Sequence, residues 1–317
     1  MFNSHFKDEV LTMEIITNKF KKVSDFCFEL FRIAEISIYN HKFSNKIYTN
    51  FQKLFLLVYK QFRKFTYEEL MTDLDDNITL KAYLGFNKLP HYTTLIKFAK
   101  QLPMQIAEKL LSAFKFLIAE PKKVAIDATG ISLDNASPHY CKRAGLSSKQ
   151  RKYMKTSFIV DIEKYLILKC KTGKSRRHET KDAQSLIKKL AKEFEPEILY
   201  ADRGYDDEKI FKLVFEKLNA YPLILQKRQE IPKYKRRGFY RKKMFAVFDY
   251  GEYLQRNKIE TCNSMFKRRF GWSVKSKNNK CQKIDVFFRV IAFNIDRLIR
   301  TGKEIILIFI KIMRISY

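Results

Sequence analysis

The chain has 317 residues, of which 46% are hydrophobic and 15% aromatic, a composition that excludes a disordered protein and allows a sizeable core. It carries 63 Lys and Arg against 34 Asp and Glu, which leaves a formal net charge of +29. Because so large an excess opposes compaction unless a polyanion is the working partner, nucleic acid is the first candidate partner and an anionic membrane surface the second.

Membrane, secreted and zinc-binding classes are disfavoured by further features of the sequence. The longest apolar runs, residues 54–59 and 305–310, are far too short to span a bilayer. Acidic residues at positions 8, 9 and 14 interrupt the N-terminus, so no signal peptide is expected. The five cysteines show neither a CxxC pair nor Cys/His ligand spacing, which indicates a reducing compartment. We therefore expect a cytoplasmic, nucleoid-associated protein without a membrane partner.

Residues 1–120 are predicted to form an all-helical N-terminal region. Three short helices are expected at residues 67–74, 78–84 and 93–102, separated by Gly85 and Pro90 before the last of them. This arrangement is compatible with a helix-turn-helix over residues 65–102, although three-helix packing of this size is common without any DNA role. If the helix-turn-helix interpretation holds, the third helix presents these side chains to DNA: Thr93, Thr94, Lys97 and Lys100.

The pattern changes to alternating strands and helices after Lys122. Residues 157–161 and 165–170 indicate a hairpin, and Thr180 is expected to cap a helix that ends near Phe194. Further strands are predicted at residues 124–127, 197–202 and 221–225, with a helix from Asp206 and Asp207 to about residue 219. These elements imply an α/β fold with a mixed sheet and helices on its faces. An amphipathic helix is expected near residues 286–300.

Residues 227–243, which we call the basic segment, carry nine cations against Glu230 alone. Tyr234, Phe239 and Tyr240 are interleaved with them. A solvated loop rarely needs such a density of positive charge, so contact with DNA phosphates is favoured. The candidate phosphate-binding side chains are Lys235, Arg236, Arg237, Arg241 and Lys242.

Residues 253–267 contain nothing that breaks a helix. Placed on one helix, Arg256, Glu260 and Lys267 fall within about 60° of Tyr253, so all four share a stripe. The opposite side is apolar and carries Leu254, Ile259, Cys262, Met265 and Phe266. This stripe is an ordinary solvated face unless other carboxylates join Glu260.

Two aspartates could supply those carboxylates. Asp127 ends an apolar strand and Asp202 ends another, and the carboxyl ends of sheet strands are where α/β proteins bind ligands. Three carboxylates suit Mg²⁺ or Mn²⁺, and two such ions can activate one oxygen and stabilise another in phosphodiester displacement. The sequence therefore favours a nuclease or strand-transfer enzyme, with Asp127, Asp202 and Glu260 as catalytic and metal-binding residues.

The spacing Tyr253-x2-Arg256-x3-Glu260-x6-Lys267 resembles the Tyr-Arg-Glu-Lys signature of DDE transposases from bacterial and archaeal insertion sequences. Residues 126–130 resemble the strand with the first Asp, and residues 200–206 resemble the block with the second. Further similarity at residues 90–94 and 293–294 extends the resemblance over about residues 65–300. These motifs occur in the family's order, with 75 residues from Asp127 to Asp202 and 58 from Asp202 to Glu260. Each motif alone is a weak signal, but this order and spacing make the resemblance specific.

The resemblance implies an RNase H-like core, two divalent metal ions, and cutting and joining of DNA at terminal inverted repeats. Carried over to this chain, it makes Asp127, Asp202 and Glu260 the metal ligands. Arg256 and Lys267 would hold DNA phosphates, and Tyr253 would contact the terminal nucleotide. Double-stranded DNA at the repeats and the target would be the partner, and a homodimer would form on it. We expect residues 1–120 to bind the DNA ends, 121–300 to catalyse, and 301–317 to form a helical tail.

Some alternatives stay open at this stage. The same core could be a nuclease without strand joining, or a non-catalytic DNA-binding domesticated copy. Trp272 could stack a base, although a lone Trp that follows Phe270 and Gly271 is more often a core residue. His178 could approach the scissile phosphate or be an ordinary loop histidine.

Overall fold

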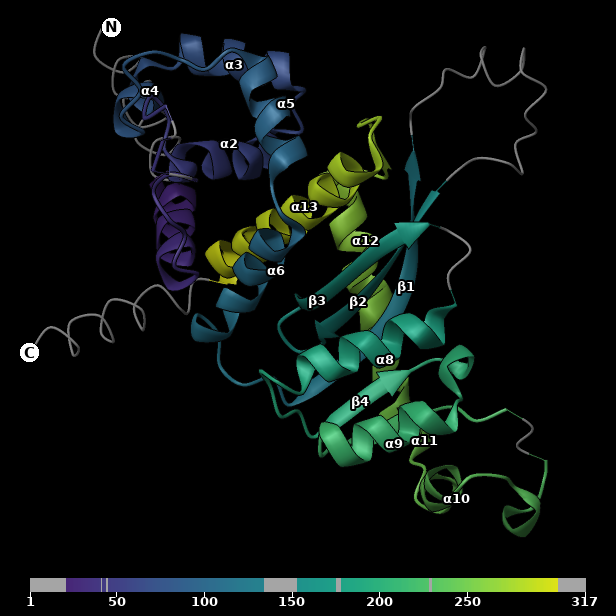
Figure 1. The fold of residues 1–317 in the computed structure, drawn as a ribbon. Coiled ribbons are helices and arrows are strands. Elements are labelled where there is room, and N and C mark those ends of the chain that lie inside the picture. The colour runs from purple at the N-terminus through teal and green to yellow at the C-terminus, as the bar shows by residue number, and fades with distance from the viewer. Residues whose placement is uncertain are drawn as a thin grey trace, which may run out of the picture. The chain divides into compact units, whose positions relative to one another are not determined.

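The computed structural model describes residues 21–40, 42–43, 45–133, 153–174, 178–227 and 230–301. The chain divides into two compact units, one comprising Met1–Ala113 with Asn294–Tyr317 and the other Phe114–Phe293 (Figure 1). In the described part of the chain, no helix is long and apolar enough to cross a membrane. Apart from Thr301, the expected C-terminal tail lies outside the described residues.

The first unit is helical, as its sequence predicts. Residues 21–33 are helical, and they are followed by α2 (Asn50–Arg63), α3 (Tyr67–Asp76), α4 (Ile78–Tyr83), α5 (Tyr92–Gln101) and α6 (Met104–Ala113). Thr66 begins α3 through a capping box in which its hydroxyl accepts from the Glu69 amide and the Glu69 carboxylate accepts from the Thr66 amide. Residues 84–91 connect α4 to α5, a longer link than the three or four residues of a standard helix-turn-helix.

The second unit is built on a mixed sheet in the order β3-β2-β1-β4-β5. The strands are β1 (Lys123–Leu133), β2 (Tyr153–Asp161), β3 (Leu166–Lys174), β4 (Ile198–Ala201) and β5 (Tyr221–Ile224). The first three pair antiparallel, whereas β4 and β5 run parallel to β1. A short sixth strand, β6 (Ser273–Val274), pairs with the end of β1. The predicted α/β class, the hairpin and the RNase H-like arrangement of strands are confirmed.

Helices cover both faces of this sheet. On one face, α8 (Glu179–Leu190) is joined to the sheet by ion pairs from Lys155 to Glu179 at 2.5 Å and from Lys171 to Asp182 at 3.3 Å. On the other face, Phe266 of α12 (Asn257–Phe270) packs edge-on against Phe158 with ring centroids 5.3 Å apart. Figure 1 shows α8 and α12 on opposite sides of the strands. The two helices therefore approach the same strands from opposite directions.

Two predicted helix starts are wrong. The stripe is not one helix, because α11 (Tyr250–Tyr253) is followed by a 3₁₀ turn (Leu254–Arg256) before α12 begins. With three residues per turn, the 3₁₀ segment rotates Leu254 out of the expected apolar face, and this side chain is 51% exposed. The helix expected from Thr180 begins instead at Glu179, after an exposed His178 at the N-cap position.

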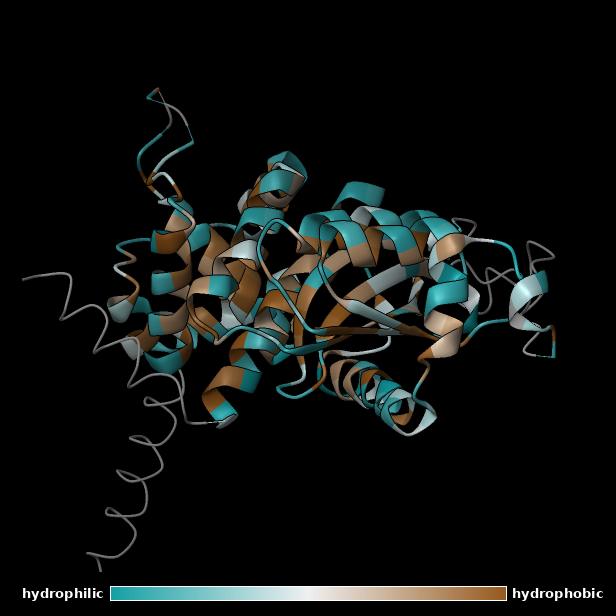
Figure 2. Cartoon of the chain, turned by 90° about the horizontal axis from the view of Figure 1, so that it is seen from below, coloured by the Kyte–Doolittle hydropathy of each residue, from teal (hydrophilic) through white to brown (hydrophobic). Residues whose placement is uncertain are grey.

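The helix expected between the strands now labelled β4 and β5 is present as α9 (Glu208–Lys217). The last described helix, α13 (Asn279–Thr301), begins earlier than predicted. The helices carry both hydrophilic and hydrophobic segments (Figure 2), as amphipathic helices do. In α13 the buried side chains include Val286, Val290 and Phe293. Polar residues of the same helix, among them Asp285 and Arg289, are buried as well. The predicted amphipathic helix is therefore present, but the protein covers its polar face as well as its apolar one.

Candidate active site

The sheet of the second unit is interrupted beside β1. On one edge of β1, β4 pairs only with Lys123–Ile126 and β6 only with Ser132–Leu133. Residues 127–131 thus have no strand partner on that edge in the described part of the chain, and we call this stretch the β1 gap. Val124, Ala125 and Ile126 are fully or almost fully buried, whereas the side chains at 127–130 are only partly covered or exposed. Strand ends at such a break in the sheet are the place where α/β proteins bind ligands.

Asp127 and Asp202 lie at the start of the β1 gap. Asp127 is the first β1 residue beyond the pairing with β4, and Asp202 is the first residue after β4. The Gly204 amide donates to Asp202 Oδ1 at 2.8 Å and fixes that carboxylate. A Cβ at Gly204 would stand 2.9 Å from the same oxygen, so a larger residue here would displace the Asp202 carboxylate. Burial raises the pKa of Asp127 to about 6, and the charge of Asp202 adds to the rise. The structure therefore brings these two predicted residues together.

Asn263 of α12 is a member of this site that sequence reasoning missed. Its Nδ2 donates to Asp127 Oδ2 at 3.0 Å, and its side chain is only 8% exposed. Its Oδ1 is buried and has no hydrogen-bond partner among the described residues. Asn263 lies one helical turn after Glu260, so it shares the face of α12 that carries the stripe. This spacing from Glu260 was the signal by which the sequence could have identified Asn263.

Glu260 is placed differently from the two aspartates. Its side chain is 60% exposed, and Arg256 Nη2 donates to its Oε1 at 2.7 Å. Arg256 also acts electrostatically on Asp127, where its positive charge opposes the rise in pKa. The structure therefore connects Glu260 to the aspartates through Arg256 and not by direct contact.

The remaining stripe residues, Tyr253 and Lys267, lie close enough to the aspartates to interact with them electrostatically. Tyr253 is 8% exposed, and burial raises the pKa of its phenol. Burial lowers the pKa of Lys267, an effect that the charge of Asp127 opposes. The Lys267 Nζ lies 5.2 Å from the centroid of the Trp272 ring. Trp272 is 59% exposed, so its interpretation as a core residue is wrong, and its indole is accessible beside a cation.

The chemistry of this site fits a divalent cation. In the described residues, no three His, Cys, Asp or Glu side chains are close enough together to hold an ion as they stand. However, Asp127 is a partly buried carboxylate whose ionisation is disfavoured by burial and by Asp202, and a cation would relieve both effects. The Asn263 Oδ1 is a further hard oxygen that the protein leaves without a donor among the described residues. The donors present are therefore of the type that Mg²⁺ and Mn²⁺ prefer.

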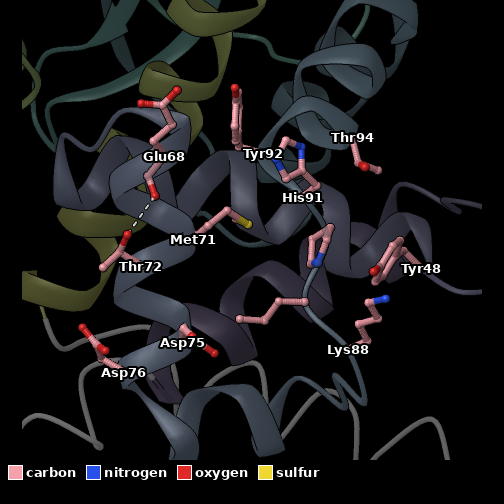
Figure 3. Close-up of a pocket in the computed structure, with 12 residues that line it drawn as sticks. Tyr48, Glu68, Met71, Thr72, Asp75, Asp76, Lys88, His91, Tyr92 and Thr94 are labelled. Carbon is pink, nitrogen blue, oxygen red and sulfur yellow. Dashed lines mark hydrogen bonds between the residues drawn. The ribbon is translucent and has the colours of Figure 1, made fainter.

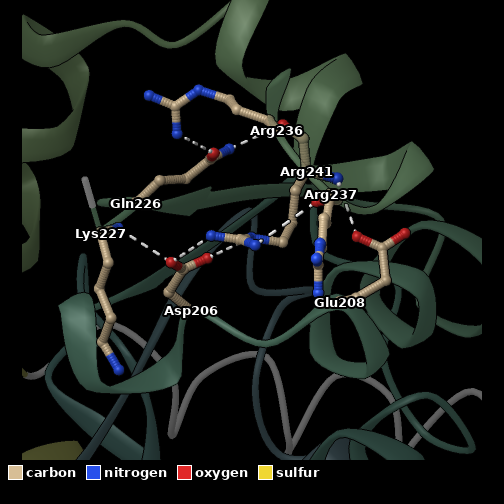
Figure 4. A network of polar contacts seen from close by, with 7 residues as sticks. All are labelled: Asp206, Glu208, Gln226, Lys227, Arg236, Arg237 and Arg241. Atoms are coloured by element: carbon tan, nitrogen blue, oxygen red, sulfur yellow. Dashed lines mark hydrogen bonds and ion pairs between the residues drawn. The ribbon is translucent and has the colours of Figure 1, made fainter. Parts of the chain in front are cut away.

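The basic segment does not present all of its cations to solvent. Arg236 is 6% exposed, donates from Nη1 to Gln226 Oε1 at 3.2 Å, and lies 3.6 Å over the Phe245 ring. Arg241 makes two bonds of 2.7 Å to Asp206, whose side chain is 1% exposed (Figure 4). These two predicted DNA contacts thus lie inside an internal network. Of the other candidates, Lys235 and Arg237 are exposed and Lys242 is half-buried.

The first unit contains a groove of about 780 Å³ between α3 and the start of α5 (Figure 3). Its lining residues are Tyr48, Glu68, Met71, Thr72, Asp75, Asp76, Lys88, Leu89, Pro90, His91, Tyr92 and Thr94. The carboxylates on the α3 side make this groove unfavourable for a phosphate backbone. Thr94, a predicted DNA contact, lies in this groove, whereas Lys97 and Lys100 are exposed on α5.

The fold and the site together define a class, namely basic proteins with an RNase H-like sheet and paired aspartates at a break in that sheet. Within this class, residues 118–295 match the family described as the Transposase DDE domain. Because this match covers more than half of the chain, the protein belongs to that family, and it is a transposase of the DDE type.

Comparisons with curated protein sequences and with solved structures add little to this assignment. No curated protein sequence matches the chain significantly. Among solved structures, the chain is similar to the piggyBac transposase in its synaptic complex with hairpin DNA, with a TM-score of 0.49 and 11% sequence identity. That alignment covers 89% of this chain and 77% of the piggyBac chain.

Proposed function

We propose that this protein is the transposase of a bacterial or archaeal insertion sequence and that it cuts and joins DNA at the terminal inverted repeats of that element. One observation carries this proposal. In a chain of the DDE family with a net charge of +29, Asp127 and Asp202 lie together at the start of a break in the sheet.

Asp127, Asp202 and Glu260 are the proposed ligands of two Mg²⁺ or Mn²⁺ ions. When bound, such ions supply a nucleophilic oxygen at neutral pH and stabilise the leaving oxygen. Asn263 holds Asp127 through the Nδ2–Oδ2 bond, so that this carboxylate keeps one orientation. Arg256, now bound to Glu260, is placed to exchange that bond for one with a DNA phosphate, because the Glu260 carboxylate is 60% exposed and can return to solvent.

The proposed DNA contacts come from both units. Beside the site they are Tyr253, Arg256 and Lys267, and in the basic segment they are Lys235, Arg237 and Lys242. Lys97 on α5 is the proposed contact in the helical region. In functional terms, residues 1–120 bind the DNA ends and residues 121–300 catalyse. A homodimer on DNA would process two ends in one complex, within the nucleoid.

Cleavage of an oligonucleotide that carries the element's ends tests the proposal. With Mg²⁺ or Mn²⁺ the wild type is expected to nick this DNA, and Asp127→Ala, Asp202→Ala and Glu260→Ala are each expected to abolish nicking. DNA binding by the three variants should stay measurable, because the exposed cations are unchanged. The control is Glu197→Ala, which removes an exposed carboxylate paired with Lys122 at 3.7 Å. Full cleavage by all three variants would overturn the assignment.

Strand joining separates a transposase from a nuclease. A supercoiled target is added to the reaction, and covalent joining of the freed 3′ ends to this target is measured. Joined products are expected for a transposase. Cleavage without joined products would favour the nuclease alternative, and DNA binding without cleavage under either ion would favour a non-catalytic copy.

A further inference from the structure

A further carboxylate reaches the site from the α8 side of the sheet. Glu179 is the first residue of α8 and lies in a part of the sequence that shares no motif with Glu260. Its charge acts on Asp127 in the same direction as that of Asp202. At the β1 gap, no described strand pairs with residues 127–131 on the β4 edge.

Gly204 locates Glu179 relative to Asp202. The point where a Gly204 Cβ would stand lies 2.9 Å from Asp202 Oδ1 and 3.5 Å from Glu179 Oε2. Both carboxylate oxygens therefore border the space that a side chain at position 204 would enter. The outer oxygen of Glu179, Oε1, bonds to Lys155 Nζ at 2.5 Å.

Tyr205 provides an independent observation at the same place. Its side chain is 0% exposed, and its hydroxyl is buried without a hydrogen-bond partner among the described residues. Asp127, Glu179 and Asp202 all act electrostatically on this hydroxyl. An unpartnered polar atom buried among carboxylates is costly, and a bound cation with its water ligands would offset that cost.

Glu179 differs from its neighbour Asp182, which has an evident structural role. The Asp182 side chain is 2% exposed and pairs with Lys171 under the helix. The Glu179 side chain is 38% exposed and that of Lys155 is 14% exposed, so opening this pair costs less than opening the buried pair of Asp182.

We propose that Glu179 is a further ligand of the divalent-cation site, entering through the β1 gap opposite Asn263, with Lys155 holding its carboxylate until the ion binds. This inference rests on the proposed function, since it adds a ligand to the same site. It gives α8 a part in binding the cation, in addition to the stripe and the two aspartates.

Binding of Mn²⁺ to the full chain in the absence of DNA tests this inference, with free Mn²⁺ measured by electron paramagnetic resonance. Glu179→Gln is expected to weaken Mn²⁺ binding roughly tenfold or more. Lys155→Met is expected to leave the affinity unchanged or raise it, because it frees the Glu179 carboxylate. Glu179→Asp keeps the charge and the Lys155 pair but shortens the reach, so a smaller loss of affinity is expected. Glu197→Gln is the matched control for an ion-paired glutamate of the same unit.

A purely structural ion pair would give another result. In that case Glu179→Gln and Lys155→Met would lower the thermal unfolding temperature alike and neither would change Mn²⁺ affinity, which would overturn the inference. If Asp127→Ala loses Mn²⁺ and Glu179→Gln does not, the role of Glu179 is overturned while the proposed function stands. If the wild type and Asp127→Ala bind Mn²⁺ equally, both proposals fail.

Discussion

Two cation-rich stretches of the second unit, the basic segment and the stripe of residues 253–267, turn out to have different surroundings. In the basic segment, Arg241 meets the buried carboxylate of Asp206 and makes two short bonds to it. In the stripe, Arg256 meets the exposed carboxylate of Glu260 and is placed near a second acid, Asp127. The basic segment is the more positive of the two in sequence, yet two of its arginines are used inside the protein.

This difference shows that the burial of the partner carboxylate decides whether an arginine serves the fold or stays available for a ligand. A buried pair is broken only at high cost, because the partner charge is left without solvent, so Arg241 stabilises the fold. An exposed pair is worth little, so Arg256 can exchange partners when a phosphate arrives. The following four changes test this comparison.

The largest change in stability is expected for Arg241→Met. This change leaves Asp206 buried without its bidentate partner, so the free energy of unfolding should fall by about 3–5 kcal/mol. Chemical denaturation of the purified variant gives the value. Lys242→Met is the neighbouring control and should change stability by less than about 0.5 kcal/mol. Equal stability of the two variants would show that the pair of Arg241 with the buried Asp206 does not stabilise the fold.

Asp127→Asn should stabilise the metal-free protein. The folded-state pKa of Asp127 is about 6, above its ordinary 3.8, so the native state binds the proton more tightly. The stability contributed by the protonated carboxyl is therefore fully present below pH 3.8 and is lost as the pH rises through 6. The loss amounts to about 3 kcal/mol at pH 7, and the neutral amide avoids it. Unfolding in EDTA at pH 4 and pH 7 measures the difference; a wild type with the same stability at both would contradict this.

Trp272→Ala should weaken the binding of single-stranded DNA ends by about 1–3 kcal/mol, because an exposed indole beside Lys267 can stack a base. Trp272→Phe keeps an aromatic face and is expected to retain most of the affinity. Fluorescence anisotropy with a labelled oligonucleotide measures both variants. A loss of folding stability in place of affinity would show that the ring packs against the protein.

The smallest effects are expected for the exposed cations of the basic segment. Arg237→Ala and Lys235→Ala should each leave stability within about 0.5 kcal/mol of wild type. Each should also reduce the slope of log affinity against log salt by about 0.9, because one phosphate contact is lost. A titration of DNA binding at several salt concentrations gives the slope. An unchanged slope in both would place the DNA elsewhere on the protein.

Much of the site was predictable from sequence, because local patterns place side chains on elements. The ends of the apolar strands marked Asp127 and Asp202, and helical spacing placed Glu260 and Arg256 on one face. Asn263 was within reach of the same spacing argument, since it lies one turn from Glu260. Tyr205 lay within the block of residues 200–206 but had no role assigned to it, and Glu179 carried no signal at all, because its relation to Asp127 depends on where β4 ends and not on any repeat.

By itself the sequence determined the α/β class, the helical first unit and the charge that favours a polyanion, because periodicity and net charge are properties of the chain alone. The RNase H-like arrangement of the strands followed from the resemblance of its motifs to a known family. Tertiary structure decided which cations stay available. Arg236 and Arg241 are drawn into the fold by Gln226 and Asp206, because burying an arginine requires partners that only folding brings close. Tertiary structure also made the β1 gap, where Asn263 of α12 bonds to Asp127 and Glu179 of α8 lies beside Gly204.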